Sequence, residues 1–335
     1  MDNIMSGTGD FTVSRREFLS TSSFSTVLLS AAQGSAGTEK VPEVADKVLL
    51  FGSVPRRHFK DGGITSDYER IARKLGIRIE IVPRAVLKAR YENLSDQERK
   101  EAAVLSKQLV AEARQGERSR PNDADIDDAV RHFLALRSMV TQRRATAAAI
   151  VCGSLGPRRM PGPCAALTLL ADSGVPTGCE GDIDAVLTMV LFQRVGGVVS
   201  FMGNASGQGN RLRVSHCVMP RRMKGGQATQ PYYLAHHHDT DSGVTIHTDL
   251  ASGEPVTAAR LTGGLKQLVM AQGTVTQSFD PGRGCRNALT IEVPEVRKIL
   301  NALRGGQNHL VVACGHHLDR LRRLVDTASI EVISA

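Results

Sequence analysis

The first part of the chain alternates short apolar runs with amphipathic segments, which is the pattern of α/β proteins. Residues 47–51 form an apolar run and residues 77–82 alternate in polarity, so both predict strands. Between them, Ser66-x-x-Glu69 is a capping box that predicts a helix ending near Leu75. The order strand, helix, strand predicts that a parallel sheet begins the folded region.

Two long and mostly polar helices are predicted next. A second capping box, Ser95-x-x-Glu98, opens a helix that we expect to end near residue 115. Another helix is predicted over residues 122–142, with Asn or Asp as its cap. The connector over residues 115–121 is charged and contains Gly and Pro, which predicts a domain boundary at this point.

From residue 145 the chain becomes richer in small and apolar residues. Residues 145–152 predict a buried strand and residues 163–171 a helix. The helix predicted over residues 182–195 is apolar almost all round, which requires burial between two layers. A further strand is predicted over residues 198–202.

Short strands separated by turn residues dominate the chain after residue 212. The turn at residues 251–255 separates two alternating runs, which predicts an antiparallel sheet or barrel. Helices are predicted over residues 294–303 and 318–325, on either side of a strand over residues 309–314. The other strands predicted in this region are 212–215, 244–248, 256–261, 268–270, 274–279 and 289–293.

Together these elements predict an α/β fold with N-terminal Rossmann-like parallel-sheet layers, followed by a β-rich, antiparallel, barrel-like C-terminal domain. We expect a first α/β domain over residues 41–120 and a second over residues 121–211, which carries the Glu180 loop and the buried helix. The β-rich domain is expected over residues 212–335 and carries His316. No dinucleotide-binding G-x-G-x-x-G sequence follows the first predicted strand.

Residues 1–40 are predicted to be a targeting segment. Ser14-Arg-Arg-Glu-Phe-Leu19 precedes a weakly apolar stretch at residues 23–32, as in a twin-arginine export signal. This stretch is too short and too rich in Ser and Thr to span a bilayer, which takes about 20 apolar residues. We therefore expect an exported protein, periplasmic or equivalent, without a stable membrane span. The alternative is a Ser-rich N-terminus with a chance pair of arginines.

Charge and cysteine usage narrow the class of protein. The net charge is +8, but the basic residues are scattered, and aromatic residues make up only 4% of the chain, so no platform for stacking bases is evident. We expect no nucleic-acid partner. The six cysteines form no C-x-x-C pair, which excludes a zinc ribbon or a thioredoxin motif. Most lie in apolar stretches, which favours buried thiols over disulfides, although export leaves oxidation of some of them open.

Acidic residues gather at the start of the apolar helix. Glu180, Asp182 and Asp184 lie where the helix dipole stabilises carboxylates, so simple capping explains such acids in general. Glu180 differs because it comes just before the helix and is directed into a loop.

Histidines are concentrated in the second half of the chain, and imidazole combined with carboxylate suits Mn²⁺, Fe²⁺ or similar ions. His316 comes just after a predicted strand, and ligand sites in α/β proteins gather at the carboxyl ends of strands. The His236-His237-His238 tract is another candidate for metal binding, although side chains alternate along a strand and at most two would converge. The histidines after residue 200 are His216, His236, His237, His238, His247, His309, His316 and His317.

Two segments resemble the L-fucose/L-arabinose isomerase-like family. Residues 178–204 are similar to a family segment in which a Glu precedes a buried helix and an acid closes the next strand, and both acids bind Mn²⁺ there. Residues 306–316 resemble the family's Asn-His, strand, Gly-His segment, whose final His is the third metal ligand. The resemblance covers about residues 145–333, and its other landmarks are Leu212-Arg-Val-Ser-His-Cys217, Gly253-x-Pro-Val-Thr257 and Gly284-Cys-Arg-Asn287.

The resemblance implies that Glu180, Asn204 and His316 bind Mn²⁺ or another divalent ion, and that Glu180 also acts as an acid or base. The family has an acid at the position of Asn204, whose neutral amide can coordinate through oxygen but cannot exchange protons near pH 7. A water, His216 or His317 would then replace the second carboxylate, and we take His216 as the second catalytic residue.

The implied activity is aldose–ketose isomerisation of a small sugar through an enediol. The alternative is a catalytically degenerate exported homologue that binds a sugar or glycan fragment without turnover, since Asn204 replaces an acid. Family members assemble as oligomers, which implies a trimer or hexamer.

Overall fold

The computed structural model describes residues 46–52, 72–116, 118, 120–152, 162–238, 242–304 and 308–335. The residues from Pro42 to Ala335 form one unit by their contacts. The twin-arginine segment expected over residues 1–40 and the capping box at Ser66 and Glu69 lie outside the described residues.

A four-stranded parallel sheet forms the first layer of this unit. Its strand order is β2-β1-β3-β4, and each neighbouring pair is parallel. Residues 48–51 of the central strand β1 are fully buried, because helices cover both faces of the sheet. The strands are β1 (Asp46–Phe51), β2 (Ile77–Val82), β3 (Ala147–Ile150) and β4 (Thr177–Gly178), which confirms the three strands predicted in this region.

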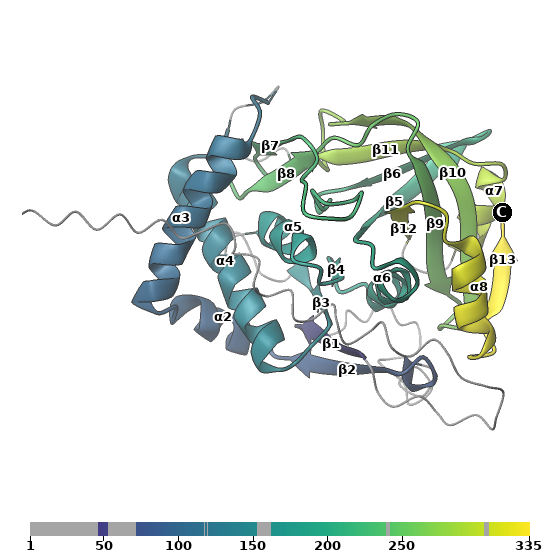
Figure 1. Ribbon diagram of the computed structural model, residues 1–335, viewed down its shortest axis with the longest axis horizontal. Helices are drawn as coiled ribbons and strands as arrows, with labels where there is room; N and C mark the ends of the chain where they lie inside the picture. Colours follow the sequence, from purple (N-terminus) through teal and green to yellow (C-terminus); the bar gives the residue numbers. More distant parts are fainter. Residues whose placement is uncertain are drawn as a thin grey trace, which may run out of the picture. The chain divides into compact units, whose positions relative to one another are not determined.

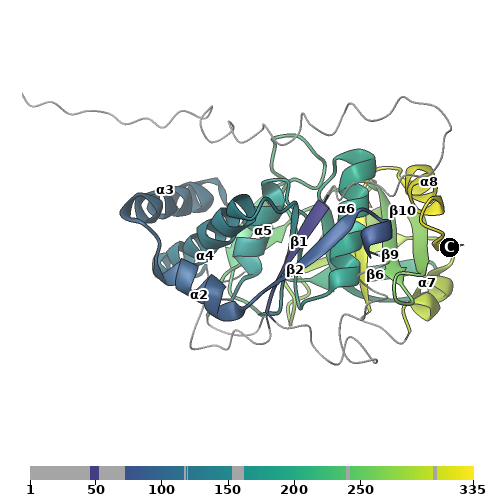
Figure 2. The same cartoon turned by 90° about the horizontal axis from the view of Figure 1, so that it is seen from below.

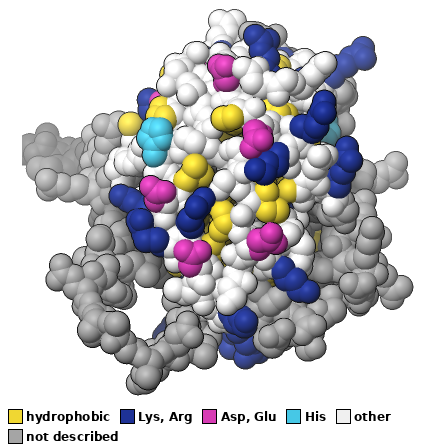
Figure 3. Space-filling view, turned by 90° about the vertical axis from the view of Figure 1, so that its right-hand side faces the viewer, with side chains coloured by type: hydrophobic (Ala, Val, Ile, Leu, Met, Phe, Trp, Pro, Cys, Tyr) yellow, Lys and Arg dark blue, Asp and Glu magenta, His cyan; other side chains and the backbone are white. Residues whose placement is uncertain are grey.

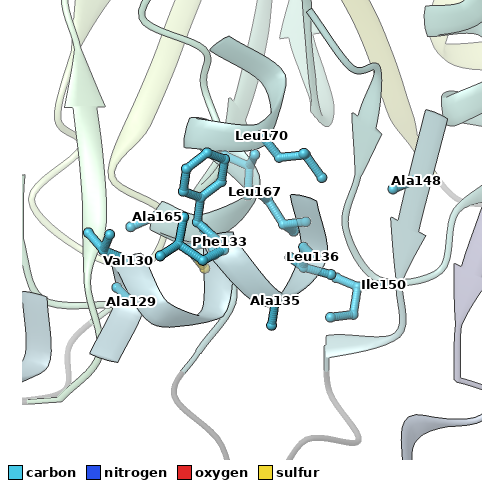
Figure 4. Close-up of a cluster of buried hydrophobic side chains, with 14 of the residues drawn as sticks. Ala129, Val130, Phe133, Ala135, Leu136, Ala148, Ile150, Ala165, Leu167 and Leu170 are labelled. Carbon is cyan, nitrogen blue, oxygen red and sulfur yellow. The ribbon is translucent and has the colours of Figure 1, made fainter. Parts of the chain in front are cut away.

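Helices α2, α4 and α5 cover one face of the parallel sheet, and α3 packs on α4. Figure 4 shows the apolar side chains of α4 and α5 meeting those of β3. Ser95 and Glu98 form the expected capping box at the start of α3, and Asn122 caps α4. Helix α2 was not predicted, because its first turn follows Pro83, which has no side-chain cap. The helices are α2 (Arg84–Glu92), α3 (Asp96–Glu112), α4 (Asp123–Gln142) and α5 (Cys164–Asp172).

Helix α6 (Ile183–Gly196) lies between the parallel sheet and a second, antiparallel sheet (Figures 1 and 2). It packs against β1, β3 and β4 on one side and against β5, β9 and β12 on the other. Asp182 caps its first turn, and Gly197 ends it in the left-handed conformation. This arrangement confirms the prediction that the apolar helix is buried between two layers.

The second sheet closes on itself as a six-stranded antiparallel barrel. The strand order is β11-β6-β5-β12-β9-β10, and pairing of β10 with β11 closes the ring. Aliphatic side chains fill the interior of the barrel. The strands are β5 (Ser200–Gln208), β6 (Arg211–His216), β9 (Pro255–Thr262), β10 (Gln267–Phe279), β11 (Asn287–Glu292) and β12 (His309–Cys314).

The remaining elements lie around the barrel. Strand β13 (Glu331–Ser334) adds to β10 in parallel, and α7 (Val296–Ala302) and α8 (Leu318–Asp326) pack on the barrel. Strands β7 (Tyr232–Ala235) and β8 (Thr245–Thr248) form a separate antiparallel pair that contacts α5 through β8. The fold is therefore α/β with a parallel sheet followed by an antiparallel barrel.

Strand β10 is a single long strand, where the sequence pattern predicted two. Its first half pairs with β9 and its second half with β11, with a bulge between Val275 and Gln277. Gly273 lies at the crossing, where a Cβ atom would be 2.5 Å from the carbonyl oxygen of Glu292. The glycine that interrupts the hydrophobic pattern is therefore the residue that lets β11 approach and close the barrel.

No helix among the described residues is both long and apolar enough to cross a bilayer. Figure 3 shows basic and acidic side chains interspersed on the face of the molecule that is on the right in Figure 1. The excess positive charge does not gather into a single patch on this face.

The junction between β4 and α6 offers a test of close packing. We expect Gly178→Ala to lower the free energy of unfolding by about 1–3 kcal/mol, a usual cost of overpacking. The reason is that the added Cβ would lie 2.2 Å from Cγ2 of Val186, which is in α6. Urea denaturation measures the change. Gly162→Ala is the matched control, because its Cβ meets no atom within 4 Å, and equal stability of the two variants would contradict this packing.

Candidate metal centre

A tight turn between β4 and α6 holds Glu180 at the carboxyl end of the parallel sheet. Glu180 has φ 56° and Gly181 has φ 69°, so two successive residues are left-handed. The amide of Gly181 donates a hydrogen bond to the carbonyl oxygen of Ile150, at the end of β3. A left-handed backbone is unfavourable for a glutamate and is common at functional sites, where surrounding structure enforces it.

Two histidines from the barrel approach the carboxylate of Glu180. The Nε2 atom of His216, the last residue of β6, lies 3.5 Å from Oε1, and Nε2 of His309, the first residue of β12, lies 3.8 Å from Oε2. The side chains of His216 and His309 are 4% and 2% exposed, whereas that of Glu180 is 40% exposed. One carboxylate that reaches solvent therefore faces two buried imidazoles.

The geometry of these three side chains fits a metal ion. One ligand atom from each lies within 4.8 Å of the others. The Nε2 atom of His309 and both ring nitrogens of His216 are buried without a hydrogen-bond partner in the described part of the chain. Buried ring nitrogens normally have a partner, and a divalent cation would provide one for both rings. A mixed imidazole and carboxylate set suits Mn²⁺ and similar ions.

Asp182 fixes the orientation of His309. Its Oδ2 atom lies 2.8 Å from Nδ1 of His309, while Arg260 in β9 donates to both oxygens of Asp182 at 2.7 and 3.1 Å. An ionised carboxylate only accepts hydrogen bonds, so Nδ1 of His309 carries the proton and Nε2 presents its lone pair toward Glu180. This carboxylate–histidine arrangement is the usual support behind a metal-binding imidazole.

Charge controls the protonation of both groups beside Glu180. Burial alone would raise the pKa of Asp182, but the Arg260 guanidinium and the His309 imidazole outweigh it and hold that pKa well below its usual range. Burial would lower the pKa of His216, yet the Glu180 carboxylate raises it above its usual value. The site without an ion therefore favours negative charge on Asp182 and a proton on His216.

Asn204 lies beside this centre. In the barrel it pairs with His309 of β12 on one side and with Ser215 of β6 on the other. Directly opposed residues of neighbouring strands share a face of the sheet, so the amide of Asn204 emerges on the same side as the imidazole of His309. From the sequence-based set, the structure thus brings Glu180 and His216 together and pairs Asn204 with His309 on the neighbouring strand.

His316 is placed elsewhere. It is exposed, and it follows the last residue of β12, whereas His309 is the first residue of that strand. The five residue steps from His309 to Cys314 alone span about 17 Å. The rule that ligands gather at the carboxyl ends of strands applies to parallel sheets, whereas β12 is antiparallel to both of its neighbours. Sequence reasoning therefore missed His309, although it belongs to the Asn308-His309 segment, and it treated Asp182 as a cap only.

Comparisons with known proteins do not assign a family to this chain. No protein-family model matches this chain, and no curated protein matches it.

The ion pair of Asp182 predicts a pH-dependent stability. We expect Asp182→Asn to lower the free energy of unfolding by about 3–5 kcal/mol at neutral pH, because buried Arg260 loses its two short ionic hydrogen bonds and keeps the more distant carboxylate of Asp184. The folded-state pKa of Asp182 is depressed, so its contribution is present above the unfolded-state pKa, near 3.9, and is lost as pH falls below it. Urea denaturation from pH 7 to pH 3 should show the difference in stability between the two proteins beginning to shrink below about pH 4.

Asp184→Asn provides the matched control for this variant. Asp184 is also in the first turn of α6, but it is partly exposed and lies 3.7 Å from Arg260, so its loss should cost less than about 1 kcal/mol. An Asp182→Asn protein as stable as the control would show that the buried pair does not organise the centre.

Proposed function

We propose that this protein is a metal-dependent aldose–ketose isomerase similar to the L-fucose/L-arabinose isomerases, with its metal centre at Glu180, His216 and His309. The observation that carries the proposal is the convergence of two buried imidazoles on one solvent-accessible carboxylate, with Nε2 of His309 directed there by Asp182. The same three residues belong to the segments whose sequence resembles that family.

Mn²⁺ or another divalent ion fits these residues, with Asn204 available to coordinate through its amide oxygen. When bound, such an ion stabilises the oxyanion charge that develops as a proton moves between neighbouring carbons of the sugar. The ring nitrogens of His216 and His309 would hold it from the barrel side, and the Glu180 carboxylate from the sheet side. The centre thus joins ligands from both layers of the fold.

The exposed part of Glu180 supplies the acid–base role. Its side chain is 40% exposed, so a sugar can reach it, whereas Asp182 is buried and its carboxylate is occupied by Arg260 and His309. His216, expected from the sequence to be the second acid–base residue, has its Nε2 atom 3.5 Å from Glu180 and would instead hold the ion through that atom. Asp182 is accordingly a positioning residue in this proposal, and Glu180 is the acid–base residue.

Asn204 favours a second candidate function. A neutral amide lies across from His309 where the family has an acid, so the centre carries one negative charge fewer and lacks a second carboxylate. General acid–base catalysis is typically worth about 10²–10⁴-fold in rate, which makes the missing group important. The second candidate is a homologue that binds metal and a sugar or glycan fragment without turnover.

Further features complete the proposal. The strand order β2-β1-β3-β4 agrees with the start of the doubly wound order 2-1-3-4-5, which supports a Rossmann-like character for the parallel sheet. Three parts of the proposal rest on the sequence alone. They are export through the twin-arginine segment, a free small sugar as substrate, and assembly into a trimer or hexamer.

Metal binding provides the first test of the proposed centre. We expect Glu180→Gln and His309→Ala each to weaken Mn²⁺ binding by more than about tenfold, because loss of even an outer-shell partner typically costs about 10–100-fold. His316→Ala is the matched control and should bind as the unmodified protein does, since His316 is exposed at the other end of β12. Isothermal titration with Mn²⁺ measures all four proteins. Weaker binding by His316→Ala alone would place the ion elsewhere.

Turnover is assayed with the same proteins, Mn²⁺ and a panel of free aldoses by following ketose formation. The isomerase proposal expects ketose from at least one aldose, and none from Glu180→Gln. Metal and sugar binding without any ketose would favour the second candidate function.

A carboxylate restored at position 204 should strengthen the centre. We expect Asn204→Asp to bind Mn²⁺ more tightly, because an anionic oxygen replaces a neutral one on the face shared with His309. Asn204→Ala is the control and should not tighten binding. If Asn204→Asp and Asn204→Ala have the same affinity for Mn²⁺, the side chain at position 204 does not face the ion.

A further inference from the structure

Three thiols and two imidazoles gather at a second point of the molecule. Cys164 is the first residue of α5, Cys217 follows β6, and Cys285 precedes β11. His237 and His238 follow β7. Four segments that are far apart in the sequence therefore contribute to one thiol–imidazole cluster, made of these five residues.

The contacts within the cluster are short. Sγ of Cys164 lies 3.3 Å from Nδ1 of His237, and Sγ of Cys285 lies 3.7 Å from Nε2 of His238. Cys217 lies close to both pairs. Its sulfur lies within 4.8 Å of the ligand atoms of Cys164 and His237, and also within 4.8 Å of those of Cys285 and His238. The rings of His237 and His238 stack with centroids 4.0 Å apart. Cys217 is thus the residue that connects the two halves of the cluster.

These separations match those of ligands around one tetrahedral ion. With Zn–S near 2.3 Å and Zn–N near 2.0–2.1 Å, neighbouring sulfur and nitrogen ligands of a tetrahedral site are about 3.6 Å apart. The two measured S–N distances, 3.3 and 3.7 Å, bracket this value. Each trio, Cys164, Cys217 and His237 or Cys217, His238 and Cys285, therefore has ligand atoms close enough to share an ion.

The donor atoms also select the kind of ion. Thiolate sulfur with imidazole nitrogen suits Zn²⁺, whereas Mn²⁺ and Mg²⁺ prefer oxygen. Cys164 and Cys217 are buried, so a dication would offset the charge of their thiolates inside the protein. The three cysteines of the cluster are free thiols in this structure, so their sulfur atoms are available as ligands.

We propose that the thiol–imidazole cluster is a structural Zn²⁺ site, held by thiolates centred on Cys217 and completed by imidazole from His237 or His238. It is separate from the centre at Glu180, which uses oxygen and nitrogen, and it does not depend on isomerase activity. Binding releases the thiol protons to solvent and ties α5 and β7 to the barrel through four segments. The cysteine spacing does not signal it, since no two of these cysteines are close in the chain, and only the His236-His237-His238 tract pointed to a metal here.

Co²⁺ is the probe for this site, because it replaces Zn²⁺ in tetrahedral sites and absorbs strongly in the near ultraviolet when bound by thiolate. The reduced, metal-free, full-length protein is titrated with Co²⁺ and then with Zn²⁺. We expect one equivalent of Co²⁺ to give thiolate absorption, and Zn²⁺ to abolish it. Cys217→Ser and Cys285→Ser should each weaken Co²⁺ binding by at least about a hundredfold. Loss of a group that only supports a ligand typically costs about 10–100-fold, and loss of a ligand itself should cost more.

Three further variants test which side chains hold the Co²⁺ ion. Cys314→Ser is the matched control, because Cys314 is a buried thiol of β12 outside the cluster, and its thiolate absorption should remain unchanged. Glu180→Gln should also keep the absorption, which distinguishes this site from the proposed isomerase centre. The double variant His237→Ala/His238→Ala removes both partly exposed imidazoles and tests the site should the cysteine variants fail to fold.

Three results would overturn the proposal. One is Co²⁺ binding without thiolate absorption, and another is absorption that survives in both Cys217→Ser and the double variant His237→Ala/His238→Ala. The third is a disulfide from Cys217 to Cys164 or Cys285 in the protein as purified, found by counting free thiols. Added Zn²⁺ should also raise the melting temperature of the unmodified protein and of Cys314→Ser, but not that of folded Cys285→Ser.

Discussion

The buried carboxylate of Asp182 joins three elements that the rest of the structure is built around. It accepts a hydrogen bond from the amide of Ala185 in the first turn of α6, two from Arg260 of β9, and one from His309 of β12. A buried charge is tolerated only when such partners surround it. The helix, the barrel and the imidazole beside Glu180 are therefore held in one arrangement by a single ionised group.

The position of α6 explains why a site forms at this point. The helix is apolar on all sides, so it is covered by the parallel sheet on one side and by the barrel on the other. The turn before it consequently ends at the boundary of the two layers, with Glu180 at the sheet edge and His216 and His309 at strand ends of the barrel. Neither layer alone contains the three side chains.

Two sets of candidate metal ligands with different chemistry meet at two successive residues of the chain. His216 belongs with Glu180 and His309, and Cys217, the next residue, belongs with the thiol–imidazole cluster. Oxygen and imidazole favour borderline ions, whereas thiolates favour Zn²⁺, so the softness of the ligands keeps the two ions apart. The proposed zinc site would also fix the end of β6 and thereby the imidazole of His216.

The sequence alone determined the local elements, because the capping box at Ser95 and the all-round apolar pattern of α6 act over a few residues. It also pointed to Glu180 as a candidate, since a carboxylate just before a buried helix is a local feature. Which imidazole meets Glu180 was decided by the tertiary structure: the antiparallel direction of β12 brings His309 to the site and carries His316 away. The same holds for the five residues around Cys217, because strand direction, register and barrel closure depend on contacts between distant parts of the chain.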